Sequence, residues 1–222
     1  MTVAAIILVP DISAALIDAD REPAVRRVAR SAWAGGALPV VAVVPSSSPA
    51  LTAVLADLPI SLAVAPAGIG PGVAWFVHGL RAATAAVAGT SAGLMWPFRY
   101  VWVDPETVTS LVEAHGPDQD AICRPAYAGK PGFPILVPVA LEPRLAAMTG
   151  LHGEEAVAQL AAEGVAERIL EMGDPGIVHD LSQARRELPP YQGPSGPAGG
   201  PPPEWNAELA ARVQGPDEPR GR

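Results

Sequence analysis

The chain has 222 residues, of which 49% are hydrophobic and 17% charged, and its net charge is −8. An acidic chain repels phosphate backbones, so we expect no nucleic-acid partner, although a local pocket can still bind a mononucleotide. The N-terminus lacks the basic start of a signal peptide, no apolar run approaches the ~18 residues of a membrane span, and the single cysteine, Cys123, excludes an internal disulfide, so we expect a cytoplasmic protein with no membrane partner.

The first half of the chain alternates short apolar runs with amphipathic segments. Runs rich in Val, Ile and Ala are typical of strands buried on both faces of a parallel sheet. Apolar residues three and four positions apart predict helices between them, and Asp104 is expected to cap one of these. The predicted strands are 3–9, 38–44, 60–65 and a part of 94–103, and the predicted helices are 23–33, 49–56, 73–87 and 105–115.

The second half is less regular. Its predicted strands are 121–124, 135–139, 168–171 and 177–179, its predicted helices are 141–148 and 154–164, and 126–134 is predicted to be a turn-rich loop. Repeated strand–helix units imply right-handed crossovers. We therefore predict a three-layer α/β/α fold with a mainly parallel, Rossmann-like sheet in residues 1–191. Residues 192–222 are rich in Pro and Gly and predict a mostly disordered tail, in which the segment around Trp205 could bind a protein partner.

The loop after the first predicted strand is the first candidate for a ligand site, because ligands bind beyond the carboxyl ends of parallel strands. A phosphate-binding loop there needs glycines and usually a Lys or Arg. The sequence instead reads VPDISAALIDADREP, with no glycine. Pro10 has no N–H to offer, and Asp11 repels phosphate. The sequence therefore argues against a working phosphate loop at this position.

Three stretches resemble the MobA-like NTP transferases, a family that includes the guanylyl- and cytidylyltransferases of molybdenum cofactor assembly. The segment WVDPETVTSLVEAHG (102–116) resembles the one that follows the family's metal-binding aspartate. RPAYAGKPGFPILVP (124–138) is similar to the family's substrate loop, Y-x-G-x-x-G-x-P, and GDPGIVHDLSQARREL (173–188) resembles its closing element, D-x-D-T-x-x-D-L. The resemblance covers about residues 1–191 and implies a fold of the nucleotide-diphospho-sugar transferase type.

Most of the family's functional residues are missing when its motifs are carried onto this chain. Of the first loop, L-A-A-G-x-S-x-R-M-G, only Ser13 survives, near the serine position. Counting back six residues from Pro105 places Arg99 where the resemblance implies the Mg²⁺-binding aspartate of D-x-P. The closing element keeps Asp180 but has Ser182 in place of a second acid. Mg²⁺ is therefore expected only if the chain is catalytically active, and no other cofactor is indicated.

The candidate site residues carry alternative interpretations. Arg99 could bind a phosphate or carboxylate as a fixed cation, or form an ordinary surface salt bridge. The loop containing Gly129, Lys130 and Gly132 could face an acceptor substrate or be a plain turn between strands. Asp104 and Asp180 are the candidate metal ligands. Asp180 or Ser182 could instead cap a helix that the spacing of DLSQARREL predicts.

The sequence leads to three hypotheses about the function of the chain. We expect a degenerate MobA-like domain without catalytic residues, which serves as a binding or assembly protein and binds a nucleotide or phosphorylated small molecule. The alternative is an active nucleotidyltransferase that moves NMP from CTP or GTP onto a phosphorylated acceptor such as molybdopterin. The third hypothesis, an unrelated α/β hydrolase or reductase, is disfavoured because the sequence has neither a nucleophile elbow nor a clean dinucleotide loop.

Overall fold

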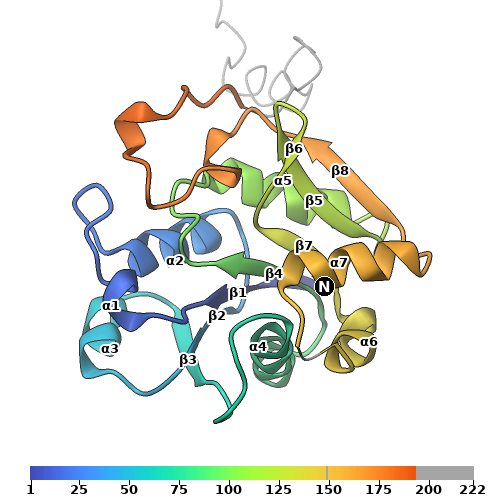
Figure 1. The fold of residues 1–222 in the computed structure, drawn as a ribbon, viewed down its shortest axis with the longest axis horizontal. Helices are drawn as coiled ribbons and strands as arrows, with labels where there is room; N and C mark the ends of the chain where they lie inside the picture. The colour runs from blue at the N-terminus through green and yellow to red at the C-terminus, as the bar shows by residue number, and fades with distance from the viewer. Residues whose placement is uncertain (149, 194–222) are drawn as a thin grey trace, which may run out of the picture.

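The computed structural model describes residues 1–148 and 150–193 (Figure 1), in which the apolar runs form one eight-stranded sheet. Along the sheet the order is β3-β2-β1-β4-β7-β5-β6, and β8 pairs with β5. The strands are β1 (Thr2–Leu8), β2 (Val40–Val44), β3 (Ile60–Val64), β4 (Thr90–Pro97), β5 (Ile122–Tyr127), β6 (Lys130–Pro131), β7 (Ile135–Pro138) and β8 (Glu167–Glu171). The four strands from β3 to β4 are parallel, and β7 runs antiparallel to both β4 and β5.

Helices cover both faces of the sheet, as the predicted three-layer fold requires. They are α1 (Ile12–Ala15), α2 (Ala24–Ala34), α3 (Pro49–Leu55), α4 (Val73–Ala86), α5 (Pro105–His115), α6 (Glu142–Ala146) and α7 (Gly153–Ala162), with single 3-10 turns η1 (Val139–Leu141), η2 (Pro175–Ile177) and η3 (Arg185–Glu187). Alternate residues of β1 belong to opposite layers: Ile7 is part of the core cluster that includes residues of α2, α3 and α5, and Ile6 is part of the cluster that includes residues of α4, α6 and α7. Figure 1 shows α2 and α4 on opposite faces of β1 and β2.

Local signals explain why these elements begin and end where they do. Asp104 caps α5 by accepting a hydrogen bond from the N–H of Glu106 at 3.0 Å, and Ser48 caps α3 by accepting one from Leu51 at 3.3 Å. Gly36 follows α2 with a φ of 88°, a conformation that favours glycine. The predicted cap at Asp104 is thereby confirmed. No helix in the described part of the chain is long and apolar enough to cross a membrane.

Two predictions near the end of the described chain were wrong. Residues 177–179 do not form a strand, because the Asp174 carboxylate accepts a hydrogen bond from the N–H of Gly176 and bends the backbone into the 3-10 turn η2. The helix predicted from DLSQARREL is reduced to the single turn η3. Asp180 accepts a bond from the N–H of Ser182 at 2.8 Å, which closes a turn rather than capping a helix.

The predicted loop over 126–134 is instead a tight hairpin, since β6 pairs antiparallel with β5. The turn between them uses positive φ angles at Ala128 and Gly129. Trp205 and the rest of the predicted tail beyond residue 193 lie outside the described residues.

Candidate functional site

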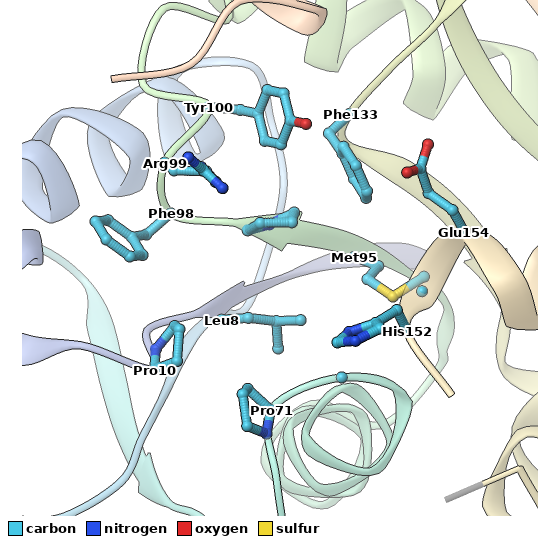
Figure 2. Close-up of a pocket in the computed structure, with 13 residues that line it drawn as sticks. Leu8, Pro10, Pro71, Met95, Phe98, Arg99, Tyr100, Phe133, His152 and Glu154 are labelled. Atoms are coloured by element: carbon cyan, nitrogen blue, oxygen red, sulfur yellow. The ribbon is translucent and has the colours of Figure 1, made fainter. Parts of the chain in front are cut away.

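A pocket of about 370 Å³ lies beyond the carboxyl ends of β1 and β4 (Figure 2). We call it the strand-end pocket. This is the position at which open α/β sheets bind their ligands. Its wall is largely carbon, contributed by Leu8, Pro10, Pro71, Met95, Phe98 and Phe133. The ionisable side chains at the pocket are Arg99, Tyr100, His152 and Glu154.

Two glycines allow the loops before α4 and α7 to approach the pocket closely. A Cβ on Gly153 would lie 2.6 Å from the sulfur of Met95, and one on Gly72 would lie 2.7 Å from the carbonyl oxygen of Leu151. The N–H of Val73 donates to that same carbonyl at 3.2 Å, so the two loops are joined directly. Gly72 therefore serves the packing of the pocket, and in the sequence it is the last glycine of the run Gly68-x-Gly70-x-Gly72.

The segment after β1 does not form an open phosphate loop. It folds into α1, and the carboxylate of Asp11 accepts a hydrogen bond from the N–H of Ala14 at 3.1 Å. An N–H that a phosphate loop would offer to a ligand is thus already bonded to an acid. Ser13 is exposed on α1 and is not among the residues that line the strand-end pocket. A ligand-binding role for Ser13 stays a prediction.

Arg99 and Asp180, both singled out from the sequence, form an ion pair. Nη2 of Arg99 lies 2.8 Å from Oδ2 of Asp180, and their side chains are 59% and 21% exposed. Burial acts to raise the pKa of Asp180, but the hydrogen bond from Ser182 and the charge of Arg99 outweigh it and hold that pKa below its ordinary value. The surface salt bridge expected as one role of Arg99 is present, whereas ligand binding by Arg99 stays a prediction.

The end of β4 offers a second placement of the family's D-x-P pattern. Met95-Trp96-Pro97 ends this strand with the same spacing, whereas counting back from Pro105 leads to Arg99 in the following loop. Met95 is buried and reaches the strand-end pocket. A thioether is a poor ligand for a hard cation such as Mg²⁺. Either placement therefore puts something other than a carboxylate where the metal-binding acid is implied.

The other candidate metal ligand, Asp104, belongs to a structural cluster around Asp174. Asp174 is buried, and its carboxylate accepts hydrogen bonds from the N–H of Asp104 at 2.9 Å, the hydroxyl of Thr107 at 2.7 Å and the N–H of Gly176 at 2.8 Å. Burial raises the pKa of Asp174 despite these bonds. Sequence reasoning passed over Asp174, although the GDPG turn was a signal for it. The cluster ties α5 to η2.

The residues present do not fit a Mg²⁺ site. Asp180 is paired with a guanidinium and Asp104 caps α5. Among the residues that the structure describes, no three His, Cys, Asp or Glu side chains are grouped so that they could hold a metal ion.

The loop of Gly129, Lys130 and Gly132 lies in the β5–β6 hairpin, the plain turn that was one of its two expected roles. Lys130 is exposed and is not among the residues that line the strand-end pocket. Gly129 donates its N–H to Glu171 at 3.3 Å. A Cβ on Gly132 would lie only 2.1 Å from the carbonyl oxygen of Ile177, so this glycine is required for close packing. An acceptor-binding role for the loop stays a prediction.

The layered fold and the pocket at its strand ends define an open α/β domain of the class that binds its ligand beyond the carboxyl ends of parallel strands. The family model for the MobA-like NTP transferase domain matches residues 14–167, and the chain belongs to that family. A search of curated proteins found no match.

Solved structures share the fold at low sequence identity. A nucleotidyl transferase from Methanothermobacter is 14% identical with a TM-score of 0.65, over 82% of this chain and 93% of that one. The 2-C-methyl-D-erythritol 4-phosphate cytidylyltransferase of Thermus thermophilus is 14% identical with a TM-score of 0.59, over 82% and 94%. Molybdopterin-guanine dinucleotide biosynthesis protein A of Archaeoglobus fulgidus is 11% identical with a TM-score of 0.54, over 76% and 83%.

Proposed function

We propose that this MobA-like domain has lost Mg²⁺-dependent nucleotidyl transfer and serves as a binding or assembly protein. The observation that carries the proposal is the ion pair between Arg99 and Asp180. Nucleotidyl transfer needs a divalent ion to neutralise the charge that develops on the phosphates. Here Asp180, the acid that the closing motif retains, is paired with Arg99, and the positive charge of Arg99 would repel a divalent ion.

Two further observations support the proposal. The loop after β1 presents the carboxylate of Asp11 where phosphate groups would need N–H donors. The strand end that would supply the metal-binding acid carries Met95. Each missing group removes stabilisation of the transition state, and the loss of one preorganised donor alone costs on the order of 10²–10³ in rate.

The alternative is an active nucleotidyltransferase that moves NMP from CTP or GTP onto a phosphorylated acceptor such as molybdopterin. It is favoured by the position of the strand-end pocket and by the activities that the names of the similar structures state. In that case Mg²⁺ would be required, and Arg99 would have to contact a phosphate directly.

Thermal unfolding with CTP, GTP or ATP, each with and without Mg²⁺, tests the proposal on the full chain. A ligand that binds the folded state raises the melting temperature. We expect no Mg²⁺-dependent rise with any of the three nucleotides, with Mg²⁺ alone and EDTA as controls. A rise that one nucleotide produces only with Mg²⁺ would overturn the proposal in favour of the active transferase.

Two parts of the proposed function rest on the sequence. We propose a cytoplasmic location, and the single cysteine, Cys123, is compatible with it because it can form no disulfide within the chain. Assembly through the segment around Trp205 stays a prediction, since that segment lies outside the described residues.

A further inference from the structure

Each charged side chain that lines the strand-end pocket forms an ion pair with another side chain of the protein. Arg99 is paired with Asp180, and Glu154 is paired with Arg124. The Arg124 side chain is only 13% exposed, and a second carboxylate, that of Glu167, lies 4.0 Å from it. The charges around the pocket therefore balance or are slightly negative, so they give an anionic ligand no net attraction.

Tyr100 lies within reach of both ion pairs, Arg99–Asp180 and Arg124–Glu154. Burial raises the pKa of its phenol most, the carboxylates of Glu154 and Asp180 raise it further, and the guanidiniums of Arg99 and Arg124 lower it. Figure 2 shows Arg99, Tyr100 and Glu154 at the same pocket. Both ion pairs thus act on the wall that Tyr100 forms, where the effect of their carboxylates on the phenol opposes the effect of their guanidiniums.

The remaining wall suits an apolar ring. The rings of Tyr100 and Phe133 are 4.8 Å apart at 35°, and Leu8, Met95 and Phe98 also line the pocket. Burying apolar surface favours binding, and aromatic walls add specific ring contacts. The volume of about 370 Å³ lies within the roughly 300–1,000 Å³ that small-molecule pockets occupy.

We propose that the strand-end pocket binds an uncharged, largely apolar small molecule with at least one ring, and that it excludes nucleoside triphosphates. The inference rests on the proposed function, because an active transferase would have to bind a triphosphate here. A triphosphate would bring several negative charges to a chain whose net charge is already −8 and would lose its hydration without gaining a free cation.

Titration of the full chain with N-phenyl-1-naphthylamine, an uncharged aromatic fluorophore, tests the inference. We expect saturable fluorescence that millimolar CTP, with or without Mg²⁺, does not displace. Met95→Asp places an unpaired carboxylate in the wall and should weaken probe binding at least about tenfold. Val64→Asp adds the same charge at an exposed position of β3. Val64 is not among the residues that line the pocket, so this variant should leave probe binding unchanged.

Asp180→Asn provides a second test that does not depend on a buried substitution. The asparagine can still accept the hydrogen bond from Ser182, but it leaves Arg99 without its counter-ion. We expect this variant to bind CTP at least about tenfold more tightly than the wild type, while probe binding is retained.

The outcomes separate the inference from the proposed function. Absence of probe binding, displacement of the probe by CTP without any need for Mg²⁺, unchanged binding in a folded Met95→Asp variant, or no gain of CTP binding in Asp180→Asn would each overturn the inference alone. A rise in melting temperature that needs both a nucleotide and Mg²⁺ would overturn the proposed function as well.

Discussion

Arg99 and Asp180 form an ion pair at 2.8 Å, and next to it the N–H of Leu181 donates a hydrogen bond, also 2.8 Å long, to the carbonyl oxygen of Arg99. The backbone bond fixes the loop after β4 against the segment that follows η2. The two side chains therefore meet because this backbone hydrogen bond already holds their loops side by side.

Arg99→Gln is expected to lower the free energy of unfolding by no more than about 1 kcal/mol, because the Arg99 side chain is 59% exposed and ion pairs with an exposed partner contribute little. Urea unfolding at neutral pH measures this. Arg81→Gln is the matched control, since Arg81 and its partner Glu142 are 63% and 21% exposed and are remote in the chain from this loop. A loss well above that of Arg81→Gln would mean that Arg99 has a structural role beyond the pair.

Asp174→Ala is expected to cost about 3 kcal/mol, because it leaves three donors, two of them in buried hydrogen bonds, without their acceptor. Asp104→Ala, which removes only the cap of α5, should cost about 1 kcal/mol. Urea unfolding of both variants gives the comparison, and equal losses would contradict the assigned role of Asp174.

The raised pKa of Asp174 also has a consequence for pH dependence. An acid whose pKa is higher in the folded state favours folding while it is protonated, so its contribution is complete below the ordinary value of 3.8 and is lost as pH rises through the folded-state pKa. The stability of the wild type relative to Asp174→Asn, measured by urea unfolding across this range, should therefore fall as pH rises. A rise instead would show that the hydrogen bonds outweigh burial.

Asp57 should behave in the opposite way. Its hydrogen bond with Arg26 lowers its pKa from 3.8 to about 2, so its contribution is present above 3.8 and is lost as pH falls toward about 2. The stability of the wild type relative to Asp57→Asn should decline over that interval in acid unfolding experiments. A difference that does not change with pH would mean that the exposed pair does not persist in solution.

The two glycines of the β5–β6 hairpin should respond differently to alanine. Gly132→Ala forces a Cβ to within 2.1 Å of the Ile177 carbonyl oxygen and should cost about 3 kcal/mol or more. Gly129→Ala meets open space and costs only the strain of a φ of 74°, about 1–2 kcal/mol. Thermal or urea unfolding of the pair measures the contrast, which would be absent if η2 could move away.

Much of the fold could be predicted because its signals are local. Alternation of apolar runs with helical spacing located β1, β2 and β3 to within two residues at either end, and the Asp104-Pro105 pair fixed the start of α5. The predicted strand at 177–179 failed because the bond that bends it comes from the side chain of Asp174, and an apolar run does not reveal such a bond. The helix expected after Asp180 failed for a related reason: its polar spacing is real, but the segment is held by contacts with Arg99 and Trp102 instead.

The candidate site was less predictable than the fold. The absent glycines were visible in the sequence, and so was the absence of any aspartate between residues 92 and 103. That Arg99 contacts Asp180 was not, because no local pattern specifies a contact between loops so far apart in the chain. The position of Met95 at the pocket depends on where β4 ends, and the sequence placed that strand only within a broad window.

The strand-end pocket draws its walls from five separate stretches of chain, which range from Leu8 in β1 to Glu154 in α7. Parallel strands supply one part and the loop between β6 and β7 supplies another. No fragment of the chain carries the whole pocket. A molecule bound there would contact both the parallel strands and the loop between β6 and β7. Its binding should therefore slow proteolytic cleavage in the loop before α4 and in the loop before α7 to the same extent.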